Sequence, residues 1–219
     1  MIKEIELSIP SSYADIPLKK WLELQKELVN YEGDEDATTA LMLFHLCGLQ
    51  PEYLGGISVE DFAKIKYQLS TFISNADLPL QRIIEIDGVE YGFEPNLSQM
   101  TYGAYADITK YDMIQIDENW TKIISVLYRP IVKKNGNLYT IKPYSGEYDK
   151  EMWLNVGMDV HLGALFFFVN LQMDLLSYTL NFSTLKGLPP NTKSILEKSG
   201  KVIQQSLNSQ KETFLKLMK

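Results

Sequence analysis

The spacing of apolar and polar residues predicts several short helices in the first third of the chain. Apolar residues recur at intervals of three and four over residues 18–29, 37–47 and 62–73. The acidic run 34–36 comes directly before the second of these segments, and Ser58 followed by Asp61 resembles an N-terminal cap before the third. Ahead of them, residues 2–9 alternate apolar and polar and predict a short first strand that ends at Pro10.

The pattern changes after residue 80 and predicts two β-hairpins. Residues 82–86 and 89–93 alternate on either side of Asp87-Gly88, and Asn135-Gly136 stands between a second pair of apolar runs. Residues 101–111 and 117–128 between the hairpins read as two more helices. We therefore expect an α+β fold that is predominantly helical and contains two β-hairpins.

Residues 158–180 predict a long helix that is apolar on almost every side. Its three consecutive aromatic residues, Phe166, Phe167 and Phe168, would point about 100° apart from one another. One face turned toward a core cannot bury all three rings. The helix is therefore either central to its own domain or lends a face to another subunit, and we name these three residues as interface candidates.

Charge divides the chain into a body and a tail. Residues 186–219 contain seven lysines and two glutamates, whereas the whole chain carries a net charge of −7. We expect an N-terminal strand and helical bundle over 1–80, a central α+β domain over 81–182 and a basic helical tail over 183–219. The tail, with Phe214 as a further interface candidate, could contact phosphate, an acidic partner or its own body.

Composition is that of an ordinary globular protein, with 45% hydrophobic and 22% charged residues. Cys47 is the only cysteine, so an intramolecular disulfide is impossible, which suits a reducing compartment. The first residues do not resemble a signal peptide, and no apolar run approaches the roughly 18 residues of a membrane span. We expect no membrane contact.

Metal or catalytic chemistry finds little support in the spacing of the reactive residues. His45 and Cys47 would lie on opposite sides of a helix, His161 is the only other histidine, and the acidic run 34–36 lacks the glycine and glutamate spacing of a calcium loop. No nucleotide-binding or hydrolase motif occurs. We expect no cofactor, no metal and no enzymatic activity. A cryptic enzyme remains an alternative, and its first candidate residues would be Asp107, Asp159, His161 and Asp174.

Aromatic residues are dense between positions 91 and 128, but their charged neighbours are mainly acidic, which disfavours stacking on nucleic-acid bases. These rings are expected in the core or an interface, with Trp120 as an interface candidate. Arg129 stands before Pro130 at the expected end of a helix, where a cation is favoured. It is expected to form a salt bridge there and is the last interface candidate.

Three segments resemble small proteins from the structural gene blocks of crAss-like and related tailed bacteriophages. They are Asp87-Gly88-Val89-Glu90-Tyr91-Gly92-Phe93-Glu94-Pro95-Asn96-Leu97-Ser98-Gln99-Met100, then Trp120 with Leu127-Tyr128-Arg129-Pro130, and then Met158-Asp159-Val160 with Gly163-Ala164-Leu165-Phe166-Phe167-Phe168-Val169-Asn170-Leu171. The resemblance covers about residues 82–172, and the preceding helices are more loosely similar to those of tail-assembly chaperones. Glu94 and Ala104 depart from the pattern.

This resemblance implies a virion or assembly protein and no catalytic residue. The leading expectation is a non-enzymatic structural component, either a portal-proximal or tail-proximal ring subunit or a packaged cargo protein. It would form homo-oligomers, bind portal or tail proteins, and reside in the virion after assembly in the host cytoplasm. The alternatives are a tail-assembly chaperone missing from the virion, an uncharacterised enzyme, and a protein that contacts DNA through the basic tail.

Overall fold

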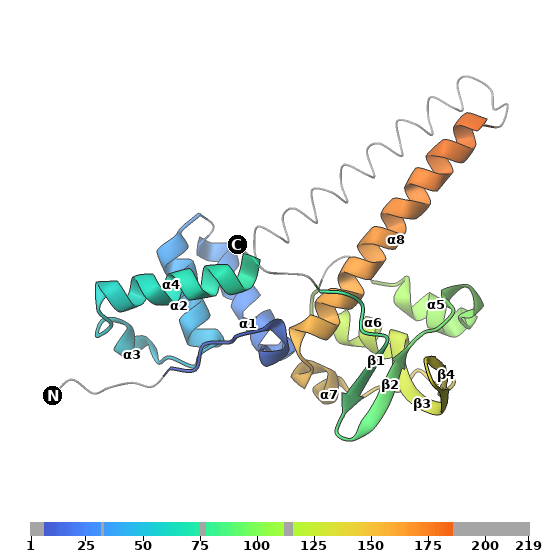
Figure 1. The fold of residues 1–219 in the computed structure, drawn as a ribbon, viewed down its shortest axis with the longest axis horizontal. Helices are drawn as coiled ribbons and strands as arrows, with labels where there is room; N and C mark the ends of the chain where they lie inside the picture. The colour runs from blue at the N-terminus through green and yellow to red at the C-terminus, as the bar shows by residue number, and fades with distance from the viewer. Residues whose placement is uncertain (1–6, 32, 75–77, 112–115, 186–219) are drawn as a thin grey trace.

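The computed structural model describes residues 7–31, 33–74, 78–111 and 116–185, and from residue 172 onward it describes only the course of a helix. The described residues form eight α-helices and one antiparallel sheet of four strands, which confirms the expected helix-dominated α+β class (Figure 1). The helices are α1 Leu18–Leu28, α2 Glu35–His45, α3 Pro51–Leu54, α4 Val59–Ser74, α5 Tyr102–Ile108, α6 Trp120–Leu127, α7 Lys150–Asn155 and α8 Met158–Leu185.

Helices α2 and α4 begin where the sequence places their caps. Asp34 accepts hydrogen bonds from the backbone N–H groups of Asp36 (3.1 Å) and Ala37 (2.9 Å), so the acidic run starts α2 as expected. Ser58 accepts from the backbone N–H of Asp61 at 3.1 Å and caps α4 in the same way. The apolar stripe of α1 is buried, which confirms the amphipathic pattern that predicted it.

Both predicted hairpins form, and they join into one sheet. The strands are β1 Ile83–Ile86, β2 Val89–Phe93, β3 Tyr128–Asn135 and β4 Leu138–Ile141, in the order β1-β2-β3-β4. The first turn has positive φ at Asp87 (51°) and Gly88 (77°), as a type I′ turn requires. The second turn is Gly136-Asn137, one residue later than the predicted Asn135-Gly136.

The edge strand β4 comes close to β2, two strands away in the sheet, because β2 contains Gly92. A Cβ atom at this position would lie 2.4 Å from Cε2 of Tyr139 and 2.9 Å from Cγ2 of Ile141. Tyr139 is held there, since its hydroxyl lies 2.7 Å from the carbonyl oxygen of Phe93. The absence of a side chain on Gly92 therefore lets β4 fold over β2.

One hydrophobic core contains residues from both the predicted N-terminal bundle and the predicted central domain, including Trp21, Leu28, Ile124 and Leu162. Backbone hydrogen bonds connect the two parts, from the N–H of Leu18 to the carbonyl of Val156 (3.0 Å) and from the N–H of Met158 to the carbonyl of Ile16 (2.9 Å). Helix α8 runs between the N-terminal helices and the sheet with α5 to α7 (Figure 1).

A glycine allows a connecting segment to cross α8 at close range. A Cβ atom on Gly163 would lie 2.7 Å from the carbonyl oxygen of Pro79. The connection from α4 to β1 therefore passes directly over the backbone of α8, and a larger side chain at position 163 would push the two apart.

Three local expectations differ from the structure. The described part of the expected first strand, residues 7–10, is not in a strand, because the sheet takes its strands only from residues 83–141. Helix α7 was not predicted, since six residues are too short to show a helical period; Asp149 caps it by accepting from the N–H of Met152 at 3.0 Å. Helix α6 ends at Leu127, so Arg129 lies within β3 rather than at a helix end.

Candidate functional site

The first half of α8 forms the centre of the core. Residues 158–169 include eight side chains that are at least nine-tenths buried, and Phe168 is one of them. The ring of Phe93 on β2 packs against Phe167 and Phe168, with centroid distances of 5.3 and 6.2 Å. Phe166 and Phe167 are partly buried at the edge of this cluster. Residues 158–171 of α8 are therefore central to their own fold. Of the three rings, only Phe166 and Phe167 keep surface that a partner can reach.

Trp120 and His161 form a buried polar pair in this core. Both side chains have 0% exposure, and Nε1 of Trp120 donates to Nδ1 of His161 at 3.0 Å. Burial lowers the pKa of His161 to about 3, and interactions with the backbone of Trp153 and Val156 oppose this only in part. The histidine is therefore neutral, and Trp120 contributes to internal packing and offers no surface to a partner in this fold.

Arg129 forms the expected salt bridge, but with a partner that the sequence did not identify. Its Nη2 donates to Oε2 of Glu94, and the two side chains are only 12% and 11% exposed. Glu94 directly follows β2, beside β3, so the sheet register brings the pair together. The helix-end argument for Arg129 was wrong because the chain is already extended from Tyr128.

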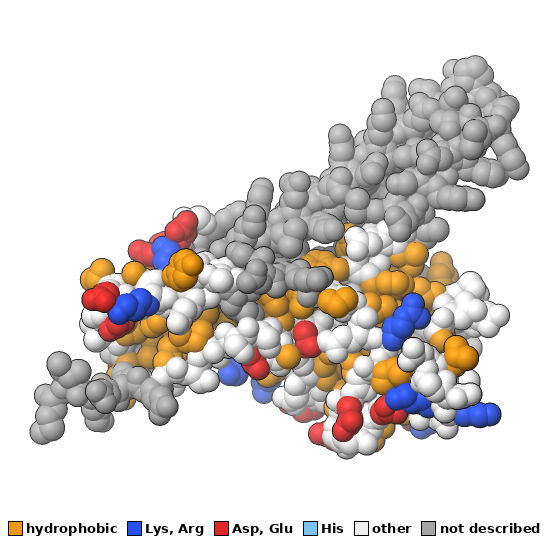
Figure 2. All heavy atoms as spheres, viewed as in Figure 1, with side chains coloured by type: hydrophobic (Ala, Val, Ile, Leu, Met, Phe, Trp, Pro, Cys, Tyr) orange, Lys and Arg blue, Asp and Glu red, His pale blue; other side chains and the backbone are white. Residues whose placement is uncertain are grey.

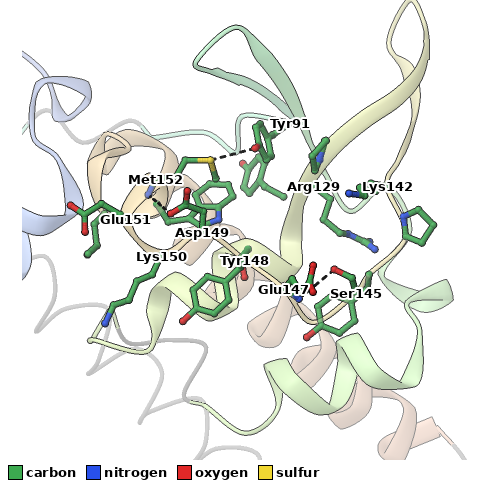
Figure 3. A pocket seen from close by; sticks show the side chains of 17 residues that line it. Tyr91, Arg129, Lys142, Ser145, Glu147, Tyr148, Asp149, Lys150, Glu151 and Met152 are labelled. Carbon is green, nitrogen blue, oxygen red and sulfur yellow. Dashed lines mark hydrogen bonds between the residues drawn. The ribbon is translucent and has the colours of Figure 1, made fainter.

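The loop after β4 and helix α7 enclose a surface groove beside this ion pair (Figure 3). Its volume is about 870 Å³, within the range of roughly 300–1,000 Å³ typical of ligand sites. Three partly buried tyrosines line it: Tyr91 from β2, and Tyr144 and Tyr148 from the loop. We call it the tyrosine groove. The sequence analysis missed it, although tyrosines and acids alternate along residues 144–151.

Two of the three tyrosines of the groove are held by hydrogen bonds to neighbouring elements. The Tyr91 hydroxyl donates to Sδ of Met152 on α7 at 3.3 Å, and the Tyr144 hydroxyl donates to Oδ2 of Asp107 on α5. Burial, reinforced by the bond to Asp107, raises the pKa of Tyr144 to about 12. Both phenols are therefore neutral near neutral pH, and their rings form fixed walls.

Residues named for a cryptic enzyme do not converge. Asp107 pairs with Lys110 at 2.8 Å, Asp159 accepts from Nε2 of Gln81 at 2.5 Å, and His161 is enclosed in the core. The side chain of Asp174 lies outside the described residues. Across the described ranges, no group of three or more histidine, cysteine, aspartate or glutamate residues is arranged to hold a metal.

His45 and Cys47 have separate environments. Nε2 of His45 lies 3.3 Å from a carboxylate oxygen of Glu27 on α1. Burial raises the pKa of the Cys47 thiol to about 11, so the reactive thiolate form is disfavoured.

The basic tail, including Phe214, lies outside the described residues, so its expected contacts with DNA or an acidic partner stay predictions. Within the described part of the chain, no helix is long and apolar enough to cross a membrane.

In comparisons with known proteins, the chain matches no family model, no curated protein and no solved structure.

Proposed function

We propose that this chain is a structural or assembly protein of a tailed-bacteriophage virion, a portal-proximal or tail-proximal ring subunit or a packaged cargo protein, and that it acts by binding other protein chains. The proposal rests on the resemblance of residues 82–172 to phage proteins and on the extension of the apolar helix α8 beyond the core. No catalytic residue, cofactor or metal is assigned.

The course of α8 is the observation that carries the proposal. At about 1.5 Å per residue, its 28 residues span roughly 42 Å. Its first half fills the core, and the helix then continues past α1 to α7 and the sheet (Figure 1). Residues 172–185 still contain seven large apolar or aromatic residues and only one charged residue, Asp174. Four of the polar residues, Asp174, Ser177, Asn181 and Thr184, share one face of the helix, and the apolar residues form a stripe on either side of that face, so a larger apolar surface than one packed face accounts for is left to cover.

Such a helix is suited to packing between chains. Burial of apolar surface stabilises an interface by roughly 25 cal/mol per Å² before the costs of association. A homo-oligomer or a complex with portal or tail proteins would therefore cover residues 172–185.

Figure 2 shows that hydrophobic side chains also reach the surface of the described body on this face. Charged side chains lie among them, mainly at the two ends of the described body.

Mass spectrometry of purified virions, with infected-cell lysate as the positive control, tests the virion assignment. The chain is expected in both samples at a constant ratio to the portal protein. Presence in the lysate alone would favour the tail-assembly chaperone, and its absence from virions would refute the structural role.

Light scattering of the purified full chain tests the role of α8. The wild type is expected to have at least twice the 25.1 kDa mass of a single chain. Leu176→Glu with Leu180→Glu should lower that mass, because the charges oppose burial of the helix. The matched control, Gln172→Glu with Ser177→Glu, adds the same charge at polar positions of the same segment and should leave the mass unchanged.

A further inference from the structure

The tyrosine groove has the chemistry of a site for an extended, proline-containing segment. Its walls are the rings of Tyr91, Tyr144 and Tyr148, together with Pro130 and Pro143 (Figure 3). Aromatic-lined grooves bind proline-rich segments because these are already extended and lose little conformational entropy on binding.

The charges of the groove favour a basic ligand. Glu147, Asp149 and Glu151 line it, and none of these carboxylates forms an ion pair within the described part of the chain. Glu94 neutralises Arg129, which leaves Lys142 and Lys150 as the remaining cations of the lining. Three carboxylates against two lysines give an excess of negative charge, concentrated on the loop and α7.

The chain itself contains a segment with the matching features. Residues 186–193 read Lys186-Gly187-Leu188-Pro189-Pro190-Asn191-Thr192-Lys193 and follow α8 directly. Two consecutive prolines favour an extended backbone, and a lysine stands on each side of them.

The geometry of α8 prevents this segment from reaching the groove of its own chain. The groove is lined by α7, which lies next to the start of α8, whereas residue 186 follows the far end of the helix, roughly 40 Å away at about 1.5 Å per residue. Four residues from Leu185 to Pro189 extend at most about 14 Å. The segment can therefore occupy only the groove of another copy.

We propose that residues 186–193 of one copy bind in the tyrosine groove of a second copy and link the chains head to tail. The two surfaces differ, so the contact is heterologous, and repetition closes into a ring when the rotation between copies allows it. This inference rests on the proposed function, since it supplies the contact through which the ring subunit would assemble.

A peptide of residues 186–193, acetylated, amidated and fluorescently labelled, tests the match by anisotropy with the full chain. The same peptide with Pro189→Ala and Pro190→Ala is the control and should bind at least fivefold more weakly. In the protein, Tyr148→Ala should weaken binding at least fivefold. The matched control is Tyr102→Ala, which removes a tyrosine that is 84% exposed on α5 and does not line the groove, and it should change nothing.

Variants in the tail give a second measurement that does not depend on the packing of Tyr148. In the full chain, Pro189→Ala with Pro190→Ala should lower the light-scattering mass, and Thr192→Ala should not. Equal binding of the two peptides, or equal effects of Tyr148→Ala and Tyr102→Ala, would overturn the proposal. If the chain is an oligomer and Pro189→Ala with Pro190→Ala does not change its mass, the head-to-tail contact is overturned, whereas the proposed function is not. A chain that is monomeric at every concentration would overturn the head-to-tail contact and the ring-subunit role, whereas virion proteomics tests the structural role separately.

Discussion

His161 should make the stability of this protein depend on pH in a way that one substitution removes. The ring is fully buried and accepts from Trp120, so it stays neutral in the folded chain and its pKa is about 3. In the unfolded chain the pKa of a histidine is about 6.5. Between these two values the unfolded state binds a proton that the folded state does not bind.

The free energy of unfolding therefore falls as the pH is lowered from 6.5 toward 3. Each pH unit well below 6.5 costs about 1.4 kcal/mol, and about half of that near pH 6.5, where the unfolded histidine is only half protonated, so acidification from pH 6.5 to 4.5 should remove about 2.3 kcal/mol through His161 alone. This is a large share of the roughly 5–15 kcal/mol that stabilises a typical domain. Above about pH 7.5 the histidine is neutral in both states and contributes almost no pH dependence.

Urea unfolding at pH 6.5 and 4.5, followed by tryptophan fluorescence, measures the effect. His161→Asn keeps an oxygen that can accept from Trp120 but cannot titrate in this range. It should be less stable than the wild type at pH 6.5, because a smaller side chain leaves a cavity. Between the two pH values it should lose about 2.3 kcal/mol less than the wild type. Equal losses in both proteins, or an NMR titration of the His161 ring above pH 4.5 in the folded state, would refute the reasoning.

Two further pairs of substitutions each compare a buried or closely packed site with an exposed or open one. Glu94→Gln should destabilise the chain by about 3–5 kcal/mol in a urea titration, because it leaves Arg129 charged and buried, whereas Glu90→Gln breaks an exposed pair and should cost at most about 1 kcal/mol. Gly163→Ala should lower the melting temperature measured by circular dichroism, because the added methyl group would collide with Pro79 at a cost of about 1–3 kcal/mol. Gly103→Ala is the control: its Cβ would meet nothing closer than 3.8 Å, and the change should be neutral or stabilising. Similar effects of the two changes would contradict the close crossing at α8.

Features fixed by neighbours in sequence were predictable. The Asp87-Gly88 turn, the Asp34 cap of α2 and the period of α8 all depend on residues a few positions apart, and each is present in the structure. The position of the second turn was off by one residue, since Asn-Gly and Gly-Asn both fit a two-residue loop.

Features that depend on distant contacts were not predictable. Arg129 was recognised as a salt-bridge residue, but its partner Glu94 lies 35 positions earlier and follows from strand pairing. Trp120 was expected in the core or at an interface, and the sequence could not decide between them; its indole lies in the core and donates to His161, 41 positions later. The tyrosine groove could not be predicted, because it is formed by the conformation of the loop after β4, and no periodic pattern in the sequence indicates that conformation.

The hydrogen bonds that join Leu18 to Val156 and Ile16 to Met158 also set the order of events during synthesis. The two partners are about 140 residues apart, so at roughly 5–20 residues per second the ribosome releases the second between about 7 and 30 seconds after the first. During this interval the apolar stripes of the N-terminal helices remain exposed to solvent. A nascent chain of this protein is therefore expected to be a client of ribosome-associated folding factors until α8 emerges.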